Sequence, residues 1–145
     1  KETIGAHWVY FPEHSFIFHR IGFPSNLSPH MAPSGVSSLS IEVSYSKYKP
    51  LPKEKLDSII VKDLMKAGLI NSKKAVLVKK AFNLPYAYVV YDQSYNSSRQ
   101  KILSFLEREG IFSIGRYGSW EYSTMENAIL AGRNVTEQIL HLFSH

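Results

Sequence analysis

Residues 115–126, with the sequence GRYGSWEYSTME, constrain this chain more than any other stretch. Two glycines allow the backbone to turn sharply and to approach a ligand closely. Ser123 and Glu126 have the S-x-x-E spacing of a capping box, which predicts that a helix begins there with its free amide groups directed back at the turn. Because an arginine and two aromatic residues lie in the same turn, the segment suits a large planar ligand that carries negative charge. The alternative is a glycine-rich turn that only packs a strand against a helix.

The length and composition predict a globular protein. The 145 residues are enough for one domain with a hydrophobic core. The apolar fraction is 44% and no apolar run reaches membrane-spanning length, so we expect a soluble protein without a membrane span. The chain has no cysteine, and residues 1–5 lead into strand-like sequence rather than a signal peptide. Both features favour a cytoplasmic location, and the lack of cysteine excludes disulfides and cysteine nucleophiles.

The net charge of +5 raises the question of nucleic-acid binding. The lysines are dispersed over predicted loops and polar helix faces, which indicates a solvated surface and no nucleic-acid partner. The positive charge can still steer small anions such as nucleotide sugars toward the protein. The six histidines are not paired at ligand spacing, so no metal site is predicted. The chain has neither a nucleophile elbow nor a phosphate-binding glycine loop.

Strand-like and helix-like segments alternate along the chain. Aromatic and alternating apolar residues predict strands over 7–11, 16–20, 38–45, 75–82, 86–91 and 111–115. Helical spacing predicts helices from near Glu54 to Gly68, over 94–109, and over 123–143. This order, with hairpin connections, predicts an α+β fold with a largely antiparallel sheet and flanking helices, an architecture typical of substrate-binding domains. No G-x-G-x-x-G follows a strand near the N-terminus, so the chain by itself lacks a pyrophosphate cradle for a dinucleotide.

Several motifs, in the same order, resemble UDP-galactopyranose mutases, the eukaryotic-type enzymes in particular. The motifs are HWVYFPE at 7–13, FHR at 18–20, FPSNLSP at 23–29, EVS at 42–44 and SKYKP at 46–50. Residues 115–122 are similar to the flavin motif G-R-(F/Y)-G-S-W-x-Y that precedes the last helix of the family. The resemblance covers nearly the whole chain. It implies that residues 1–145 form a single domain, the C-terminal part of a longer FAD-dependent protein of the amine-oxidase and protoporphyrinogen-oxidase superfamily, whose Rossmann half lies upstream.

The resemblance also implies a reaction. In the mutases the N5 atom of reduced flavin attacks the anomeric carbon of the sugar, UDP leaves, and the sugar ring opens and recloses without net redox change. Arg20 matches the arginine that binds the substrate diphosphate, a role that suits a guanidinium fork. Trp8 and Tyr10 match residues lining the sugar–nucleotide cleft, and their spacing places both on one side of a strand. By the residues alone, Arg20 is better explained as a surface arginine of a strand, and core packing explains Trp8 equally well.

Three more residues are implied to contact the substrate. Tyr122 matches a tyrosine that donates to the diphosphate. Tyr86 matches a second tyrosine, although a small gap in the local alignment leaves Tyr88 as the alternative. Asn26 matches an active-site asparagine, and an Asx-type turn cap explains it nearly as well.

The flavin side of the site is implied to include the last helix, which makes this a flavin-contacting C-terminal helix. The implied cofactor-binding residues are Gly115, Arg116, Gly118, Trp120, Met125 and Glu126. The first amides of the helix, near Met125 and Glu126, would face the flavin pyrimidine oxygen and stabilise the negative charge of the reduced ring.

Some residues depart from the mutase pattern. His19 replaces the aromatic residue that usually precedes the diphosphate arginine, and residues 123–126 and 88–91 are closer to the general amine-oxidase form. An FAD-dependent amine oxidase or protoporphyrinogen oxidase-like oxidoreductase is therefore the first alternative, and a non-catalytic binding module is the second. The chain by itself is expected to be inactive and not to retain FAD, and its expected partners are the missing N-terminal FAD-binding half and a nucleotide sugar or other small molecule.

Overall fold

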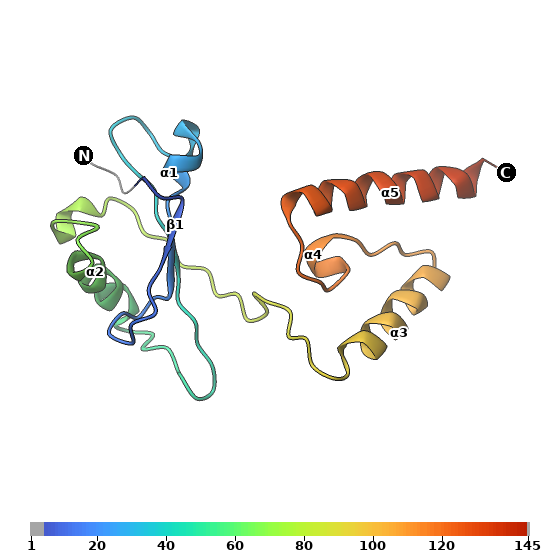
Figure 1. Cartoon of the computed structure of the whole chain (residues 1–145), viewed down its shortest axis with the longest axis horizontal. Coiled ribbons are helices and arrows are strands. Elements are labelled where there is room, and N and C mark those ends of the chain that lie inside the picture. The colour runs from blue at the N-terminus through green and yellow to red at the C-terminus, as the bar shows by residue number, and fades with distance from the viewer. Residues whose placement is uncertain (1–4, 145) are drawn as a thin grey trace. The chain divides into compact units, whose positions relative to one another are not determined.

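The computed structural model describes residues 5–144; residues 1–4, which belong to the stretch where no signal peptide is expected, and His145 lie outside this range. The residues group into two compact units, Lys1–Lys80 and Ala81–His145, and each is described by itself (Figure 1). The expectation that residues 1–145 form a single domain of a longer protein stays a prediction.

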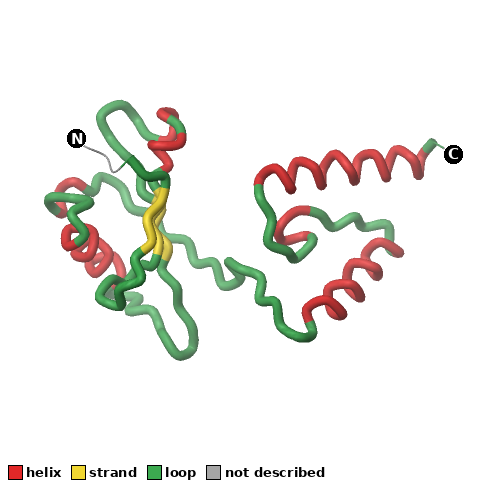
Figure 2. The backbone as a smooth tube through the Cα atoms, viewed as in Figure 1, coloured by secondary structure: helices red, strands yellow, loops and turns green. Residues whose placement is uncertain are grey.

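The first unit is built on a three-stranded antiparallel sheet with strand order β1–β2–β3 (Figure 2). The strands are β1 (Trp8–Tyr10), β2 (Arg20–Gly22) and β3 (Ser40–Glu42). The helical elements are α1 (Pro24–Leu27), η1 (Pro29–Met31), α2 (Leu56–Lys66) and η2 (Lys73–Ala75). This arrangement confirms the predicted α+β class with an antiparallel sheet and flanking helices.

The middle residue of each strand faces the hydrophobic core. Val9 pairs with Ile21, which pairs with Ile41, and Ile21 is 0% exposed. Leu64 of α2 belongs to the same buried cluster, together with Phe18. Since side chains alternate between the two faces of a strand, the residues on either side of these three point to the opposite, open face of the sheet.

The predicted second strand is displaced along the chain. We expected it over 16–20, whereas β2 begins at Arg20. The rings of Phe16 and Phe18 lie 5.1 Å and 5.0 Å from that of Phe11 and pack as a cluster. The Ile17 amide donates to Asp63 Oδ2 at 2.8 Å, so its partner is a side chain of α2 and not a neighbouring strand.

Asp63 is a buried carboxylate whose removal should be costly. We expect Asp63→Ala to lower the free energy of unfolding by about 1–3 kcal/mol, because the Ile17 amide loses its acceptor. Asp63→Asn keeps an acceptor oxygen, so its free energy of unfolding should fall by less. Urea unfolding of both variants measures the difference, and equal losses would contradict this role of the carboxylate.

Three other predicted strands are wrong. Residues 76–91 contain no strand, and Gly115 opens a short helix, α4 (Gly115–Gly118), instead of ending a strand over 111–115. A strand needs a neighbour to form its ladder, and the described part of the chain supplies none to these segments. Their strand-like composition therefore does not produce a strand.

The second unit contains α3 (Tyr95–Arg108), α4 and α5 (Met125–Phe143), so the two long predicted helices are confirmed (Figure 1). Helix α3 ends at Gly110 as predicted. Gly110 has φ +75°, and the amide of Ile111 donates to the carbonyl oxygen of Leu106 at 2.8 Å, which closes a Schellman motif. Gly68 ends α2 in the same conformation, with φ +71°.

The cap of α5 lies one residue later than predicted. Thr124, not Ser123, is the N-cap, and its Oγ1 accepts from the amide of Asn127 at 3.2 Å. Glu126 is therefore the second helical residue, where a carboxylate is still favourable near the helix N-terminus. In the described part of the chain, Ser123 Oγ is buried and has no hydrogen-bond partner.

The apolar faces of α3 and α5 are at most half-buried. We expected these faces to be buried, but no described residue of 81–144 is buried. Met125 is 87% exposed and Ile129 is 73% exposed. The second unit therefore has amphipathic helices without a core of its own.

Candidate ligand-binding site

Three residues predicted to bind the substrate share the open face of the sheet. The register pairs Tyr10 with Arg20 and Trp8 with Gly22, so the three side chains leave the face opposite Ile21. The Arg20 guanidinium carbon lies 5.5 Å from the centroid of the Trp8 ring and 5.6 Å from that of Tyr10, which is within cation–π range. Trp8 is 50% and Tyr10 61% exposed, so neither ring belongs to the core of this unit.

Glu42 completes this group from the neighbouring strand. Arg20 Nη1 donates to Glu42 Oε1 at 3.0 Å, and His19 Nε2 lies 3.6 Å from Glu42 Oε2. Within residues 5–144, the Nδ1 atom of His19 and the Nε atom of Arg20 are buried without a hydrogen-bond partner. We call Trp8, Tyr10, Arg20 and Glu42 the sheet group. Sequence analysis gave Glu42 no role in the site, and the signal that could have found it is the register that pairs it with Arg20.

Asn26, in α1, binds the backbone before β1. Its Nδ2 donates to the carbonyl oxygen of Ala6 at 2.7 Å. This bond ties α1 to the segment that leads into β1, so Asn26 has a structural contact in this chain. Its role toward a substrate stays a prediction.

Arg116 is the centre of a second group. Its guanidinium carbon lies 5.2 Å from the ring centroid of Tyr88 and 5.0 Å from that of Tyr122, and its Nη2 donates to the carbonyl oxygen of Ala87 at 3.4 Å. We call Tyr88, Arg116 and Tyr122 the turn group. It joins a residue predicted to bind the cofactor, Arg116, to one predicted to bind the substrate, Tyr122. Of the two tyrosines left open by the sequence, the structure brings Tyr88 to Arg116, whereas Tyr86 packs against Trp120 with centroids 6.4 Å apart.

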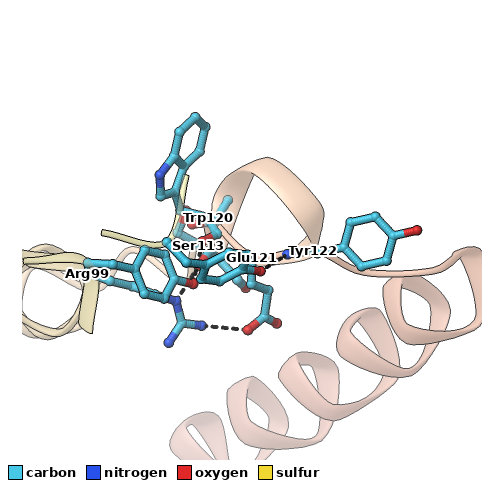
Figure 3. A network of polar contacts seen from close by, with 9 residues as sticks. Arg99, Ser113, Trp120, Glu121 and Tyr122 are labelled. Atoms are coloured by element: carbon cyan, nitrogen blue, oxygen red, sulfur yellow. Dashed lines mark hydrogen bonds and ion pairs between the residues drawn. The ribbon is translucent and has the colours of Figure 1, made fainter. Parts of the chain in front are cut away.

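Side chains from outside hold the turn after α4 (Figure 3). They donate to three successive carbonyl oxygens: Ser113 Oγ to Gly118 at 3.0 Å, Arg99 Nε to Ser119 at 2.5 Å, and Tyr95 Oη to Trp120 at 2.7 Å. The next two residues are bound as well, since Arg99 Nη2 donates to Glu121 Oε2 at 3.0 Å and the Tyr122 amide donates to Tyr91 Oη at 2.8 Å. Each residue from 118 to 122 thus has at least one contact with a side chain outside the turn. Sequence analysis missed these partners, and all of them except Ser113 are distant in sequence.

Trp120 has an unusual backbone conformation. Its φ of 48° lies in the left-handed region, which is rare for a side chain of this size. Its amide donates to the carbonyl oxygen of Tyr117 at 3.3 Å, and the Glu121 amide donates to that of Arg116 at 3.0 Å, so Trp120 occupies the Schellman position that usually holds glycine. Such strain costs about 1–3 kcal/mol, and the hydrogen bonds around the turn offset it.

Glycine is needed for different reasons at the two positions predicted to contact the cofactor, Gly115 and Gly118. Gly115 has φ +80°, a conformation that favours glycine, and open space around it. A Cβ at Gly118 would lie 3.1 Å from Ser113 Oγ and 3.3 Å from the Ser113 carbonyl carbon. Gly118 therefore permits the close approach of another segment of this chain, and a ligand contact there stays a prediction.

We expect Gly118→Ala to destabilise the turn by about 1–3 kcal/mol, because backbone atoms of Ser113 cannot move away as a side chain would. Gly132→Ala is the matched control, since no atom lies within 4 Å of its added Cβ and alanine is the better helix former. Hydrogen exchange at Ser119 and Trp120 reports on the turn. Equal exchange in both variants would contradict the steric role of Gly118.

The start of α5 carries the last two predicted cofactor residues. Met125 and Glu126 are both exposed, and they form the first helical turn. The helix N-terminus there is electropositive, and the amide of Asn127 donates a hydrogen bond to Thr124 Oγ1. The amides of the first turn are placed as the capping argument requires, one residue later than expected.

Some classes of site are not found in residues 5–144. These residues contain no cluster of three or more histidine, cysteine or acidic residues that could hold a metal ion. None of their helices combines the length and hydrophobicity that a membrane crossing requires. A hollow of about 410 Å³ lies on α3 and is lined by Ser97, Lys101 and Arg108 among others, and it includes no predicted site residue.

The fold and its two arginine–aromatic groups define an α+β protein in which two arginines each lie beside aromatic rings. Among solved structures, the chain is similar to reduced UDP-galactopyranose mutase, with a TM-score of 0.78 and 29% sequence identity over 97% of this chain. This chain spans 30% of the length of that mutase chain. No family model matches the chain. The comparison supports a structural similarity to the mutase family at modest identity.

Proposed function

We propose that this chain is the substrate- and flavin-contacting part of an FAD-dependent enzyme that resembles UDP-galactopyranose mutase and acts on a nucleotide sugar. The observation that carries the proposal is that the Arg20 guanidinium lies close to the rings of both Trp8 and Tyr10 on the open face of the sheet. A guanidinium binds two phosphate oxygens at once, and aromatic rings stack on a uracil or a sugar face. An oxidase substrate without a diphosphate gives no reason for this arrangement, so the sheet group favours the mutase-like function.

The turn group and the start of α5 suit a flavin. Arg116 supplies a positive charge, the turn that follows it is held at five successive residues, and the Oγ atom of Ser123 is buried without a partner in the described part of the chain. A bound flavin would supply the electron-rich N5 centre for attack on the sugar. Arg116 and the first amides of α5 would stabilise negative charge on the ring, by roughly 1 kcal/mol for the helix terminus. Tyr88, Trp120 and Tyr122 would offer aromatic surfaces beside it.

The proposal also requires a second part of the enzyme, an N-terminal FAD-binding region that is not contained in residues 1–145. Two observations support it: this chain spans 30% of the length of the mutase chain, and no described residue of 81–144 is buried. Amphipathic helices gain most of their stability from covering their apolar face, so α3 and α5 need a further surface. The chain alone offers no cradle for the FAD pyrophosphate, and we expect purified protein to be colourless.

Titration with UDP-galactose, followed by NMR, tests the proposal on the 145-residue chain. NMR detects millimolar affinities, which are appropriate for half of a site. We expect the indole resonance of Trp8 and the Arg20 side-chain resonances to shift together, while those of the exposed Tyr48, in the same unit, stay unchanged. Galactose without the nucleotide is the ligand control. If UDP-galactose shifts no sheet-group resonance, the result contradicts the mutase-like proposal and favours the oxidoreductase or the binding module. A yellow preparation with a flavin spectrum would contradict the expected loss of FAD.

A further inference from the structure

We propose that Glu42 is a positioning residue for Arg20, and that the charge of His19 sets how strongly Glu42 holds it. The inference rests on the proposed role of Arg20 as the diphosphate-binding residue. It adds two residues to that site and a dependence of ligand affinity on pH.

The geometry places one carboxylate between two cationic side chains. One oxygen of Glu42, Oε1, accepts from Arg20 Nη1 at 3.0 Å, and the other, Oε2, lies 3.6 Å from His19 Nε2. The backbone fixes this meeting, since Arg20 pairs with Glu42 in the sheet register and the His19 amide donates to the Glu42 carbonyl oxygen at 3.1 Å. Glu42 therefore holds Arg20 through its Nη1 atom.

This contact leaves other donors of Arg20 for a ligand. A guanidinium has five N–H groups, and Glu42 engages Nη1. The Nε atom is buried and has no partner among the described residues. Because Glu42 also fixes the plane of the guanidinium close to the Trp8 and Tyr10 rings, the free donors have a preferred direction before any ligand arrives.

The charge state of His19 changes how readily Arg20 can bind a diphosphate. With neutral His19, the charges of Arg20 and Glu42 cancel, and a diphosphate must compete with the carboxylate. Protonation of His19 gives the carboxylate a second cation, weakens its hold on Arg20, and leaves a net charge of +1 on the three residues. The charged and titratable groups facing this cluster are Glu42 from β3, Arg20 from β2 and Tyr10 from β1, and His7 lies beside the Trp8 ring with centroids 6.2 Å apart.

The first experiment tests the link between His19, Glu42 and Arg20 without any ligand. Histidine side chains change charge between pH 5 and 8, so we follow the Arg20 Nε–H resonance of the 145-residue chain by NMR from pH 5.5 to 7.5. We expect it to move with pH in the unmodified chain and in His7→Gln. It should stay in place in His19→Gln and in Glu42→Gln, which keeps an acceptor for Arg20 but removes the charge. Movement that persists in either of the last two variants would overturn the proposal.

The second experiment measures affinity for UDP-galactose. This ligand is preferred to UDP because its diphosphate has no terminal phosphate group that titrates near pH 6. Affinity should rise roughly two- to fivefold from pH 7.5 to 5.5, because protonated His19 weakens the competition of Glu42 for Arg20 by about the energy of a partly exposed ion pair. The rise should vanish in Glu42→Gln; a rise that persists there would mean that His19 acts on the ligand directly and would overturn the role of Glu42. If UDP-galactose fails to bind while the Arg20 resonance behaves as expected, the proposed function fails and the Glu42 contact stands.

Discussion

Arg20→Ala is expected to weaken UDP-galactose binding roughly 10- to 100-fold, because a charge-assisted hydrogen bond contributes about 1.5–3 kcal/mol. The substitution removes the only proposed diphosphate ligand in the sheet group and leaves the strand backbone intact. Arg20→Lys keeps the charge but not the planar fork, so it should recover only part of the affinity. NMR titration of the Trp8 indole resonance measures all three affinities.

The matched control for Arg20 is Arg133→Ala. Arg133 is an exposed arginine of α5 that approaches Glu137 at 4.0 Å, and it belongs to neither group. Its removal lowers the net charge by the same amount, so it measures the effect of long-range steering alone. If Arg133→Ala weakens binding as much as Arg20→Ala does, general electrostatic attraction explains the binding and the diphosphate role of Arg20 is wrong.

Phe18→Ala should have the largest effect on stability, a loss of about 3–5 kcal/mol in the free energy of unfolding of the first unit. Phe18 is 1% exposed, and its ring packs against those of Phe11 and Phe16 with centroids 5.0 Å and 5.5 Å apart. The loss is a large share of the 5–15 kcal/mol that is typical of a whole domain. Urea unfolding followed at the Trp8 indole resonance reports on this unit, because Trp8 lies in β1.

Phe143→Ala provides the comparison. Phe143 is 85% exposed at the end of α5, so its removal should change the stability of the chain by less than about 0.5 kcal/mol. Similar losses in the two variants would mean that Phe18 is not the centre of the core that its burial indicates.

Local signals in the sequence predicted the elements that depend on local interactions. Gly68 and Gly110 end α2 and α3 as expected, since a left-handed residue at a helix end is decided within a few residues. The predicted start of α5 was displaced by one residue because Ser123 and Thr124 can both cap a helix, and the backbone bonds to Thr124. The choice between them depends on packing that neighbouring residues do not encode.

The strand predictions over 75–82 and 86–91 failed for a different reason. Their aromatic and β-branched residues favour extended structure, but a ladder needs a partner strand, and no described segment pairs with them. The same limit applies to the site. Glu42 is 22 residues from Arg20, and Arg99 is 20 residues from Ser119, so only the folded chain reveals that they bind.

The sequence by itself determined the α+β class and the glycine ends of α2 and α3, and its motifs indicated the candidate residues Trp8, Tyr10, Arg20, Arg116 and Tyr122. Periodicity, glycine position and motif order suffice for these, because each is a property of a short segment. Only the tertiary structure decided that Glu42 holds Arg20, that Tyr88 rather than Tyr86 meets Arg116, and that five outside contacts fix the turn around Trp120. These pairings join segments far apart in the chain, so they depend on strand register and on how each turn packs.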